Sequence, residues 1–472
     1  MFSICRKNCP AGHSSNDIGY RNFKNNINSN GICGLCTKEH FIQEFRTWSS
    51  GNPNIDKIIQ ETQLNDFFFK LQWIPYEKFQ DIKHIANGGR GSVCSAELEN
   101  GIKWYWNFNT LDWEFDLVNH RVALKEINDS SYDVVEILRV YMTVALHSEC
   151  MTKYYGISKN PSTQNFIIVT ELFDNDLNDF LTENFWDLGW ETKIDILSPI
   201  VQGLLSLNEK DLVHCNFHSG NILIEHNFNF ENFDIASIID LDSCKFENDL
   251  IINSNNKNNI IYGTIPYIPP EVLRGNEYTR EGNIYSFGGI MYEIITAQRP
   301  FADQAHDTYL MIDICNGVRP KVPDFMLNWI PEWYLNLMYR CWSDDPSERP
   351  TAIELYDLFC NVSEKLYNNV VNNNVMRQLK IADENQKNTS KSQKKEFLEL
   401  FSHSNKLHSQ SCYISRGIHT LHGLRDLLED LKSGKSADPN LLLMNNELST
   451  NIDGDPEIQS KQKNVGLGYD SQ

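Results

Sequence analysis

The sequence predicts an α+β fold in which β-rich runs come first and helical periodicity follows. From about Glu77 the chain passes through short extended apolar stretches, and further on the apolar residues recur at the spacing of helices. The chain has 472 residues, 41% of them hydrophobic and 11% aromatic, so it can bury at least one large core. We therefore expect a globular domain flanked by more polar ends.

Charge and cysteine content narrow the class of protein. The formal net charge of −21 argues against general affinity for nucleic acid or an anionic membrane. Eight of the 12 cysteines lie singly between Cys94 and Cys412, as reduced thiols usually do. The chain begins without an apolar targeting segment, and no stretch approaches the length of a membrane span. We expect a soluble intracellular protein, in the cytoplasm or the nucleus, that binds neither nucleic acid nor membrane.

Composition divides the chain into four segments. Residues 1–50 form a polar leader, and residues 51–76 predict a linker helix with Asn54 as its N-cap and Ile55, Ile58 and Ile59 on one face. Residues 77–366 form the globular domain. Residues 367–472 are rich in Asn, Ser and Lys and predict a low-complexity, mostly disordered tail. Within the tail, the spacing of Leu424 and Leu431 with two leucines between them predicts one short amphipathic helix.

The leader contains two cysteine pairs, Cys5-x₃-Cys9 and Cys33-x₂-Cys36. Four thiolates presented in this way can hold a tetrahedral Zn²⁺ ion, and metal binding would organise a segment too polar to fold alone. His13 or His40 could replace one thiolate. A structural zinc site and free thiols in an unstructured leader both remain open.

An aromatic cluster lies at residues 104–115, which hold three Trp, one Tyr and two Phe. A long hairpin that stacks its own aromatic rings explains the cluster, and so does a face that binds a partner. The sequence leaves both interpretations open.

A glycine-rich run joins two extended stretches at residues 85–93 (IANGGRGSV). Glycines such as Gly88 and Gly91 let a hairpin backbone approach a polyphosphate, because a Cβ would stand in the way. Ala86 replaces the first glycine of the usual G-x-G-x-x-G pattern. Hairpins of this kind are common, so the run permits a phosphate site without establishing one.

A lysine and a glutamate further along could complete such a site. Lys125 ends the alternating strand of residues 122–125 (VALK) and could reach α- and β-phosphates. Glu136, in the helix expected next, could pair with Lys125 and hold its ammonium group at the nucleotide. Glu126 and Glu149 compete for that role, and each of the three could instead be a surface carboxylate.

Five further signals follow in a fixed order, and seven ordered signals are not a coincidence. The five are residues 214–221 (HCNFHSGN) in the pattern H-R-D-x-x-x-x-N, Asp240 at the place of D-F-G, residues 263–271 (GTIPYIPPE) in the pattern G-T-x-x-Y-x-A-P-E, residues 283–288 (NIYSFG) in the pattern D-x-x-S-x-G, and Cys341-Trp342 with Arg349-Pro350 in the pattern C-W…R-P.

On these motifs the sequence resembles eukaryotic protein kinases of the tyrosine-kinase-like branch, and it is similar to the expanded kinase sets of mycorrhizal fungi. The resemblance covers about residues 77–365. It implies a bilobal protein-kinase fold, with a β-rich N-lobe at 77–172 and an α-helical C-lobe at 173–366. It also implies ATP and Mg²⁺ as cofactors and a protein substrate or signalling partner.

The resemblance implies a role for each matching residue. Asn221 and Asp240 would hold Mg²⁺ ions, Lys125 would contact phosphates, and Arg349 would form a buried pair with Glu271. The other residues of the implied ATP site are the loop residues Ala86, Gly88 and Gly91, the adenine contacts Val93, Ala123 and Leu223, the gatekeeper Thr170, and the hinge Glu171 to Phe173.

Three departures from the pattern concern catalysis. Asn216 stands where an aspartate accepts the proton of the substrate hydroxyl, and a carboxamide has almost no basicity. Losing a positioned general base costs roughly 10²–10⁴-fold in rate, about 3–5 kcal/mol of barrier. Asn283 replaces an aspartate that braces the catalytic loop, and Asp242 replaces the glycine of D-F-G.

Three functions are consistent with these residues. The first is an ATP-binding signalling protein of the protein-kinase family, a pseudokinase with weak or lost phosphotransfer. The second is an active serine/threonine kinase that compensates for Asn216. The third and most distant is a small-molecule phosphotransferase, against which the segment ending in Glu271 and the pairing residue Arg349 argue.

Overall fold

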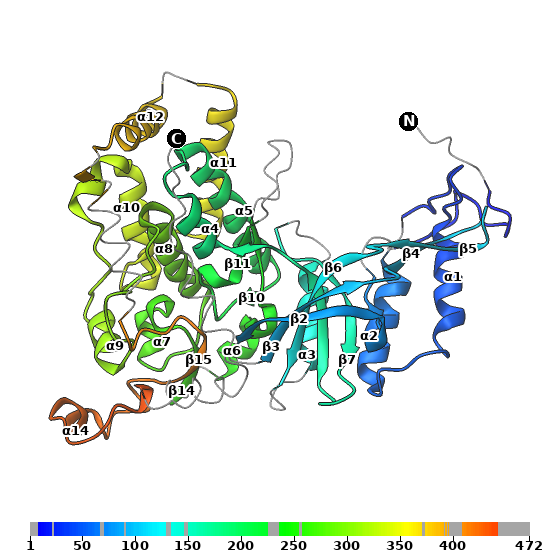
Figure 1. Ribbon diagram of the computed structural model, residues 1–472, viewed down its shortest axis with the longest axis horizontal. Coiled ribbons are helices and arrows are strands. Elements are labelled where there is room, and N and C mark those ends of the chain that lie inside the picture. The colour runs from blue at the N-terminus through cyan, green and yellow to red at the C-terminus, as the bar shows by residue number, and fades with distance from the viewer. Residues whose placement is uncertain are drawn as a thin grey trace, which may run out of the picture.

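The computed structural model describes residues 8–441 except 21–22, 67–69, 89–90, 129–133, 146–149, 225–235, 254–256, 371–372, 391, 394 and 396–407. These residues form two lobes, one built on a sheet and one helical, as Figure 1 shows. The predicted α+β fold with a β-rich part before a helical part is confirmed.

The first lobe is built on a six-stranded sheet. All neighbouring strands run antiparallel except β1, which pairs in parallel with β7. The order across the sheet is β1 (Gln72–Trp73), β7 (Tyr154–Lys159), β8 (Phe166–Glu171), β6 (His120–Ile127), β3 (Gly91–Leu98), β2 (Phe79–Gly88).

Three helices accompany this sheet: α1 (Gly34–Glu44), α2 (Pro53–Asn65) and α3 (Val134–Ala145). Helix α2 begins two residues earlier than predicted, because its N-cap is Asn52 and not Asn54: the side chain of Asn52 accepts a hydrogen bond from the backbone of the first turn. Its Ile55 and Ile59 are fully buried in the main core, so this helix belongs to the lobe as well as linking to the leader.

A second, two-stranded sheet projects between β3 and β6. Strands β4 (Ile102–Asn107) and β5 (Asp112–Asp116) form this hairpin and carry most of the aromatic cluster. Figure 1 shows α1 beside the hairpin, at the end of the molecule remote from the helical lobe.

The helical lobe contains nine of the described helices and several short strands. The helices are α4 (Leu177–Asn184), α5 (Trp190–Glu209), α6 (Glu247–Asn253), α7 (Pro270–Leu273), α8 (Arg280–Thr296), α9 (Thr308–Cys315), α10 (Glu332–Cys341), α11 (Ala352–Tyr367) and α12 (Asn374–Lys387). The strands are β9 (Asn175–Asp176), β10 (Leu212–Val213), β11 (Ile222–Ile224), β12 (Ala236–Ile238), β13 (Lys245–Phe246) and β14 (Ile260–Gly263).

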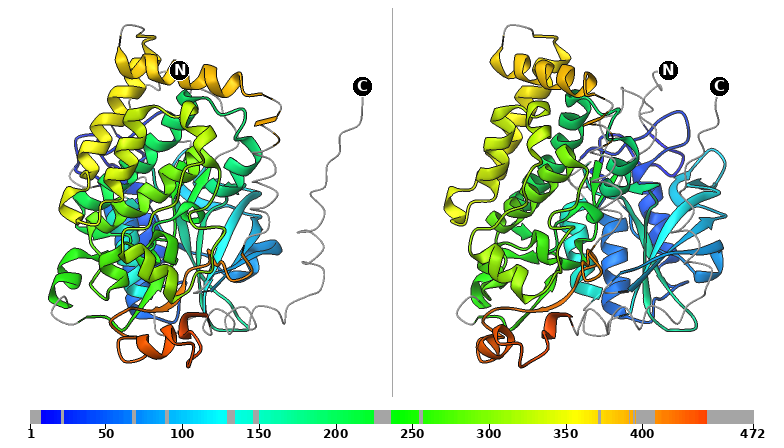
Figure 2. Two further views of the ribbon diagram at one scale, coloured as in Figure 1. Left: turned by 90° about the vertical axis from the view of Figure 1, so that its left-hand side faces the viewer. Right: turned by 60° about the vertical axis from the view of Figure 1, so that its left-hand side comes forward.

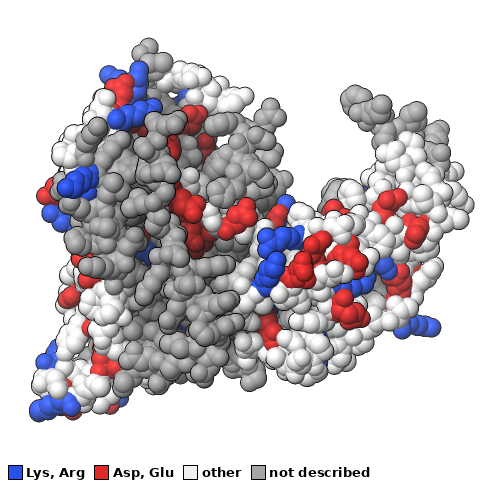
Figure 3. All heavy atoms as spheres, viewed as in Figure 1, with Lys and Arg blue, Asp and Glu red and all other residues white. Residues whose placement is uncertain are grey.

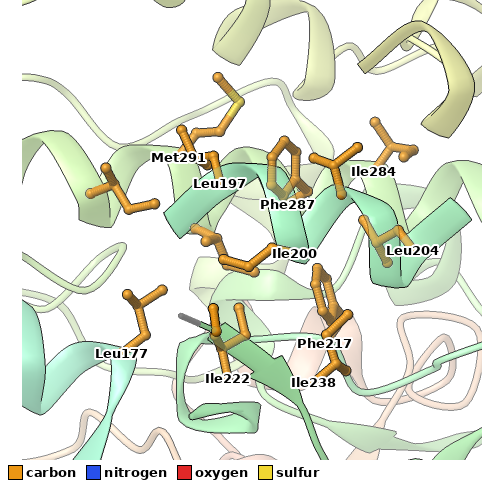
Figure 4. Packing of buried hydrophobic residues seen from close by; sticks show 14 of the residues in the cluster. Leu177, Leu197, Ile200, Leu204, Phe217, Ile222, Ile238, Ile284, Phe287 and Met291 are labelled. Carbon is orange, nitrogen blue, oxygen red and sulfur yellow. The ribbon is translucent and has the colours of Figure 1, made fainter. Parts of the chain in front are cut away.

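Helices α5 and α8 form the centre of the helical lobe. Apolar residues recur on both helices at intervals of three and four, and the structure buries them completely, as with Leu197, Ile200 and Phe287. Figure 4 shows these side chains in one buried cluster with Ile222 of β11 and Ile238 of β12. The loop that precedes β11 and the turn that follows β12 are therefore fixed to a rigid core.

The prediction of a mostly disordered tail is wrong for two stretches of residues 367–472. Helix α12 buries Met376 and Leu379, and residues 408–441 pack on the helical lobe with β15 (Arg416–His419) and α14 (Leu428–Lys432). Composition misled because a few buried residues, such as Ile418 and Leu424, suffice to fix a segment on a surface that already exists. Helix α14 is also shorter than the predicted helix, which was based on the leucine spacing from Leu424 to Leu431.

On the face drawn in Figure 3, acidic and basic side chains of the described residues are intermixed over the sheet lobe. This part of the surface therefore presents no continuous field of one sign. None of the described helices combines the length and the apolar character that crossing a bilayer requires.

Candidate functional site

The glycine-rich run forms the hairpin between β2 and β3. The two strands remain paired up to Gly88 and Gly91, and Ala86 stands opposite Val93. A Cβ on Gly91 would lie 1.8 Å from the carbonyl oxygen of Glu126 in β6. Glycine is therefore required at this position for the close approach of β3 to β6, independently of any phosphate.

Most residues assigned to the base and phosphates share one face of the sheet. Directly opposed residues of antiparallel strands point to the same side. Val93 opposes Lys125, and Ala123, two residues before Lys125, opposes Thr170. Because Ala86 opposes Val93, all five residues project from the same face.

Three further predicted residues lie where the two lobes join. Glu171 ends β8, with Oε1 3.4 Å from Nζ of Lys153. Phe173 follows it in the connection to β9, and Leu223 in β11 stands opposite Asp176 of β9. The chain thus crosses between the lobes at the residues assigned to the hinge.

The two predicted magnesium ligands and Asn216 meet within hydrogen-bond distance. Asn216 Nδ2 donates to Asp240 Oδ2 at 3.1 Å, and Asn221 Nδ2 lies 3.3 Å from the same oxygen. Asn221 Nδ2 also donates to the backbone oxygen of Asn216 at 2.9 Å. The fully buried His214 supports this arrangement, since its Nε2 donates to the carbonyl of Ile239 at 3.0 Å.

Lys125 is held by two carboxylates at the end of β12. Its ammonium group pairs with Asp240 Oδ1 and with Asp242 Oδ2, the latter at 2.6 Å. Burial works against the charged form, but the two aspartates outweigh it and raise the pKa of Lys125 well above its usual value. The hydroxyl of Tyr141 on α3 donates to the other oxygen of Asp242.

The expected pair between Lys125 and Glu136 is not present in this conformation. The Glu136 side chain is 59% exposed and lies 3.5 Å from Arg139 on the same helix. Asp242 stands in the buried position beside the lysine, with only 1% of its side chain exposed. The sequence flagged Asp242 as a departure, yet gave no sign that it would replace the helix glutamate as partner of Lys125.

The side-chain oxygen of Asn216 accepts a hydrogen bond from a residue of the tail. Ser415 Oγ donates to Asn216 Oδ1 at 2.7 Å and lies 3.2 Å from Nε2 of His218. Burial lowers the pKa of His218 to about 3, so its imidazole is neutral at physiological pH. Sequence reasoning missed Ser415, because a serine in a polar segment carries no signal of its own.

Two predictions about the supporting structure have different outcomes. The buried pair of Arg349 and Glu271 is present, with Nη1–Oε1 and Nη2–Oε2 distances of 2.7 and 2.8 Å. Asn283 is buried on α8, but its Nδ2 has no hydrogen-bond partner among the described residues. An aspartate, which only accepts hydrogen bonds, would leave no such donor unpaired.

The leader brings four potential metal ligands together: Cys9, His13, Cys33 and Cys36. Nδ1 of His13 lies 3.4–3.6 Å from the three sulfurs, and the Cys9 and Cys36 sulfurs are 3.6 Å apart. A tetrahedral zinc ion with ordinary bond lengths separates its ligand atoms by about 3.5–3.8 Å. The four side chains therefore have the spacing of a zinc site.

This ligand set differs from the four cysteines predicted. Cys5 lies outside the described residues, and His13, one of the two histidines that the sequence offered, takes the fourth position. Its Nε2 lies 3.1 Å from Glu39 Oε1, the second contact that metal-binding histidines usually make. His40 stacks on Trp106 instead, with ring centroids 3.5 Å apart.

The leader is also the partner of the aromatic hairpin. The backbone of Trp106 donates to Thr37 Oγ1 at 3.1 Å, and Trp113 Nε1 donates to Glu44 Oε1 at 2.9 Å. The Phe41 ring packs on Trp113 at 4.6 Å. Two of the three tryptophans thus contact α1, so the hairpin faces a segment of its own chain.

The comparisons with known proteins agree with this geometry. The family model described as protein tyrosine and serine/threonine kinase matches residues 79–359, more than half of the chain. A probable LIM domain-containing serine/threonine-protein kinase of Dictyostelium discoideum is 26% identical over 215 residues, which cover 46% of this chain and 31% of the relative.

Two other relatives extend the comparison. A putative serine/threonine-protein kinase/receptor of Acanthamoeba polyphaga mimivirus is 30% identical over 243 residues, covering 49% of this chain and 13% of its own. The probable serine/threonine-protein kinase kinX of Dictyostelium discoideum is 27% identical over 319 residues, which cover 64% of this chain and 25% of the relative. The chain thus spans less than a third of the length of each of these relatives.

Proposed function

The chain belongs to the protein tyrosine and serine/threonine kinase family, and from that premise we propose that it is an ATP-binding signalling protein of the tyrosine-kinase-like branch with weak or lost protein phosphotransfer. The proposal separates two properties that usually occur together in this family. One is nucleotide binding, for which the charged residues Lys125 and Asp240 remain. The other is acceptance of the substrate hydroxyl's proton, for which Asn216 stands in place of the usual aspartate.

Support for nucleotide binding comes from the residues that surround Asp240. Lys125 supplies the positive charge, and Asn221 and Asp240 supply the oxygen ligands that Mg²⁺ prefers. When bound, Mg²⁺ neutralises charge on the β- and γ-phosphates. Lys125 now pairs with Asp240 and Asp242, so it must exchange one of these partners for a phosphate oxygen.

The observation that supports weak or lost phosphotransfer is the environment of Asn216. Its Nδ2 donates to Asp240, and its Oδ1 accepts a hydrogen bond from the Ser415 hydroxyl at 2.7 Å. The amide can thus orient a hydroxyl but cannot remove its proton. No described side chain that meets this hydroxyl is an effective base, since burial lowers the pKa of His218 to about 3.

The same hydrogen bond favours a second candidate, an active serine/threonine kinase. Phosphoryl transfer in protein kinases passes through a loose transition state. Orienting the acceptor hydroxyl therefore contributes much of the catalysis. An enzyme of this kind would retain measurable transfer with Asn216 in place. The two candidates therefore differ in rate and not in nucleotide affinity.

Nucleotide binding is tested by titrating the full chain with MgATP. The wild-type chain is expected to bind, and Lys125→Met and Asp240→Asn are each expected to weaken binding at least ten-fold. Lys321→Met is the matched control, because that lysine is 78% exposed and pairs with Asp324 outside the predicted nucleotide site. Absence of MgATP binding in the wild-type chain would refute both candidates.

We also propose a structural Zn²⁺ ion bound by Cys9, His13, Cys33 and Cys36. Three of these side chains are buried, and Glu39 supports His13 from outside the ligand set. A complete set of four protein ligands is the arrangement of structural rather than catalytic zinc. The ion would fix the leader against the β4–β5 hairpin.

A further inference from the structure

Residues 408–441 pack on the helical lobe and contact the loop that carries Asn216. Strand β15 pairs antiparallel with β14, with Gly263 opposite Arg416 and Ile260 opposite His419. Strand β14 leads directly into the segment that ends at Glu271. Figure 1 shows β15 beside β14, and both views of Figure 2 show the same segment along the face of the lobe.

This pairing places Ser415 at the centre of the site. Its Oγ donates to Asn216 Oδ1 at 2.7 Å and lies 3.2 Å from His218 Nε2 and 3.3 Å from Thr264 Oγ1. By the resemblance to protein kinases, the loop of Asn216 and His218 would position an acceptor hydroxyl, and the segment of Thr264 would carry a protein substrate. A hydroxyl side chain thus meets all three groups together.

We propose that residues 408–441 occupy the protein-substrate site of their own chain, with Ser415 at the position of the acceptor hydroxyl. The inference rests on the proposed function, because it takes the loop around Asn216 as a phosphotransfer site. It identifies the class of ligand that competes for the site, an extended peptide with a serine directly before the residues that pair with β14.

The segment is anchored before Ser415 by specific contacts. The fully buried His306 lies 2.8 Å from the carbonyl of Cys412 through its Nδ1, and the Tyr413 hydroxyl donates to the carbonyl of Pro300 at 2.8 Å. The guanidinium of Arg299 lies over the Tyr413 ring, 4.9 Å from its centroid. The approach to Ser415 is therefore fixed in one path.

Equally specific contacts follow Ser415. Arg416 is 2% exposed and donates to the carbonyl oxygens of His306 and Asn440 at 2.9 and 2.7 Å. Further along, Asp438 accepts hydrogen bonds from the backbone and the hydroxyl of Thr308 at the start of α9, at 2.8 and 2.7 Å. Substrate site and anchors are separate, so the anchors can be weakened without altering the site.

The test uses the full chain and a fluorescent synthetic peptide of residues 408–425. The double substitution Arg416→Ala/Asp438→Ala removes both anchors after Ser415 and leaves the site residues intact. Asp426→Asn is the matched control, because its side chain lies in the same segment and is 89% exposed. We expect the double variant to bind the peptide at least ten-fold more tightly than the wild-type and Asp426→Asn chains do.

The role of the hydroxyl is tested in the peptide itself. Replacing the serine that corresponds to Ser415 by alanine is expected to weaken binding about five-fold, the effect of one lost hydrogen bond to a buried amide. A double variant that keeps its helical circular dichroism but binds the peptide no better than the wild-type chain would overturn the proposal. Equal binding of the serine and alanine peptides would also overturn it.

Two measurements keep the test decisive. If the double variant does not fold, Asp438→Asn alone takes its place, with an expected gain of at least three-fold in peptide binding and no gain as the contradicting result. Peptide binding is measured without nucleotide. Failure to bind MgATP would thus refute the proposed function, whereas failure of peptide exchange would refute only the occupied substrate site.

Discussion

Replacing Glu271 by glutamine should destabilise the helical lobe strongly. Arg349 has no exposed side-chain surface, and it pairs with Glu271 through two contacts of 2.7 and 2.8 Å. Removing one partner of a buried ion pair costs about 3–5 kcal/mol, because the remaining charge is left without compensation. Arg349 also donates to the carbonyls of Ser343 and Glu281, both at 3.0 Å, and the glutamine oxygen can still accept one hydrogen bond.

Because these contacts remain, we expect Glu271→Gln to lower the free energy of unfolding by about 3 kcal/mol, the lower end of that range. This corresponds to roughly a hundred-fold change in the unfolding equilibrium. The free energy of unfolding is measured by urea denaturation with circular dichroism. Glu281→Gln is the matched control, since it makes the same chemical change at an exposed position on α8 and should cost less than about 0.5 kcal/mol. A loss below about 1 kcal/mol for Glu271→Gln would refute the claim that this pair fixes the segment after β14.

Three further predictions concern the metal, the pH dependence and the sheet. The purified chain should contain one equivalent of zinc by elemental analysis; Cys33→Ser should remove it and His40→Ala should not, and a wild-type chain without zinc would contradict the site. Burial raises the pKa of Glu293 to about 7, so folding takes up a proton between about pH 4.5 and 7 and stability falls as the pH rises through that window. Glu293→Gln should therefore be more stable than the wild-type chain by about 3 kcal/mol at pH 8 and nearly equal to it at pH 4.5, and equal urea midpoints at pH 8 would contradict this. Gly91→Ala should destabilise the sheet lobe by at least about 2 kcal/mol, because its Cβ would meet the Glu126 carbonyl at 1.8 Å, and an unchanged midpoint would exclude that approach of β3 to β6.

Sequence patterns predicted the fold and the convergent part of the site, because both depend on residues in fixed order. Asn216 lies in the loop before β11 and Asp240 in the turn after β12; because these two strands pair antiparallel, the loop and the turn lie at the same end of them and the two side chains meet at 3.1 Å. The pair of Glu271 and Arg349, 78 residues apart, was predictable only through the family resemblance.

Contacts that depend on a conformation were not predictable in this way. Glu136 and Asp242 both carry a carboxylate that can reach Lys125, and the sequence does not say which one is buried beside it. Asp242 is the partner of Lys125 because the turn after β12 holds its carboxylate in the interior. Glu136 stays solvated on α3, so its carboxylate incurs no desolvation cost.

Contacts between distant polar segments were also missed. Ser415 meets Asn216 across 199 positions of sequence, and nothing in the composition of the tail indicates it. His13 was one of two histidines that could complete the leader cluster, and only the packing of His40 on Trp106 decides between them.

The central claim, that Asn216 preserves nucleotide binding but removes proton acceptance, is tested most directly by Asn216→Asp. MgATP affinity and transfer of the γ-phosphate to a serine peptide are measured for both chains, with Asn328→Asp as an exposed control for the same chemical change. We predict similar affinities and a transfer rate about 10²–10⁴-fold higher for Asn216→Asp. A wild-type rate equal to that of Asn216→Asp would contradict the claim.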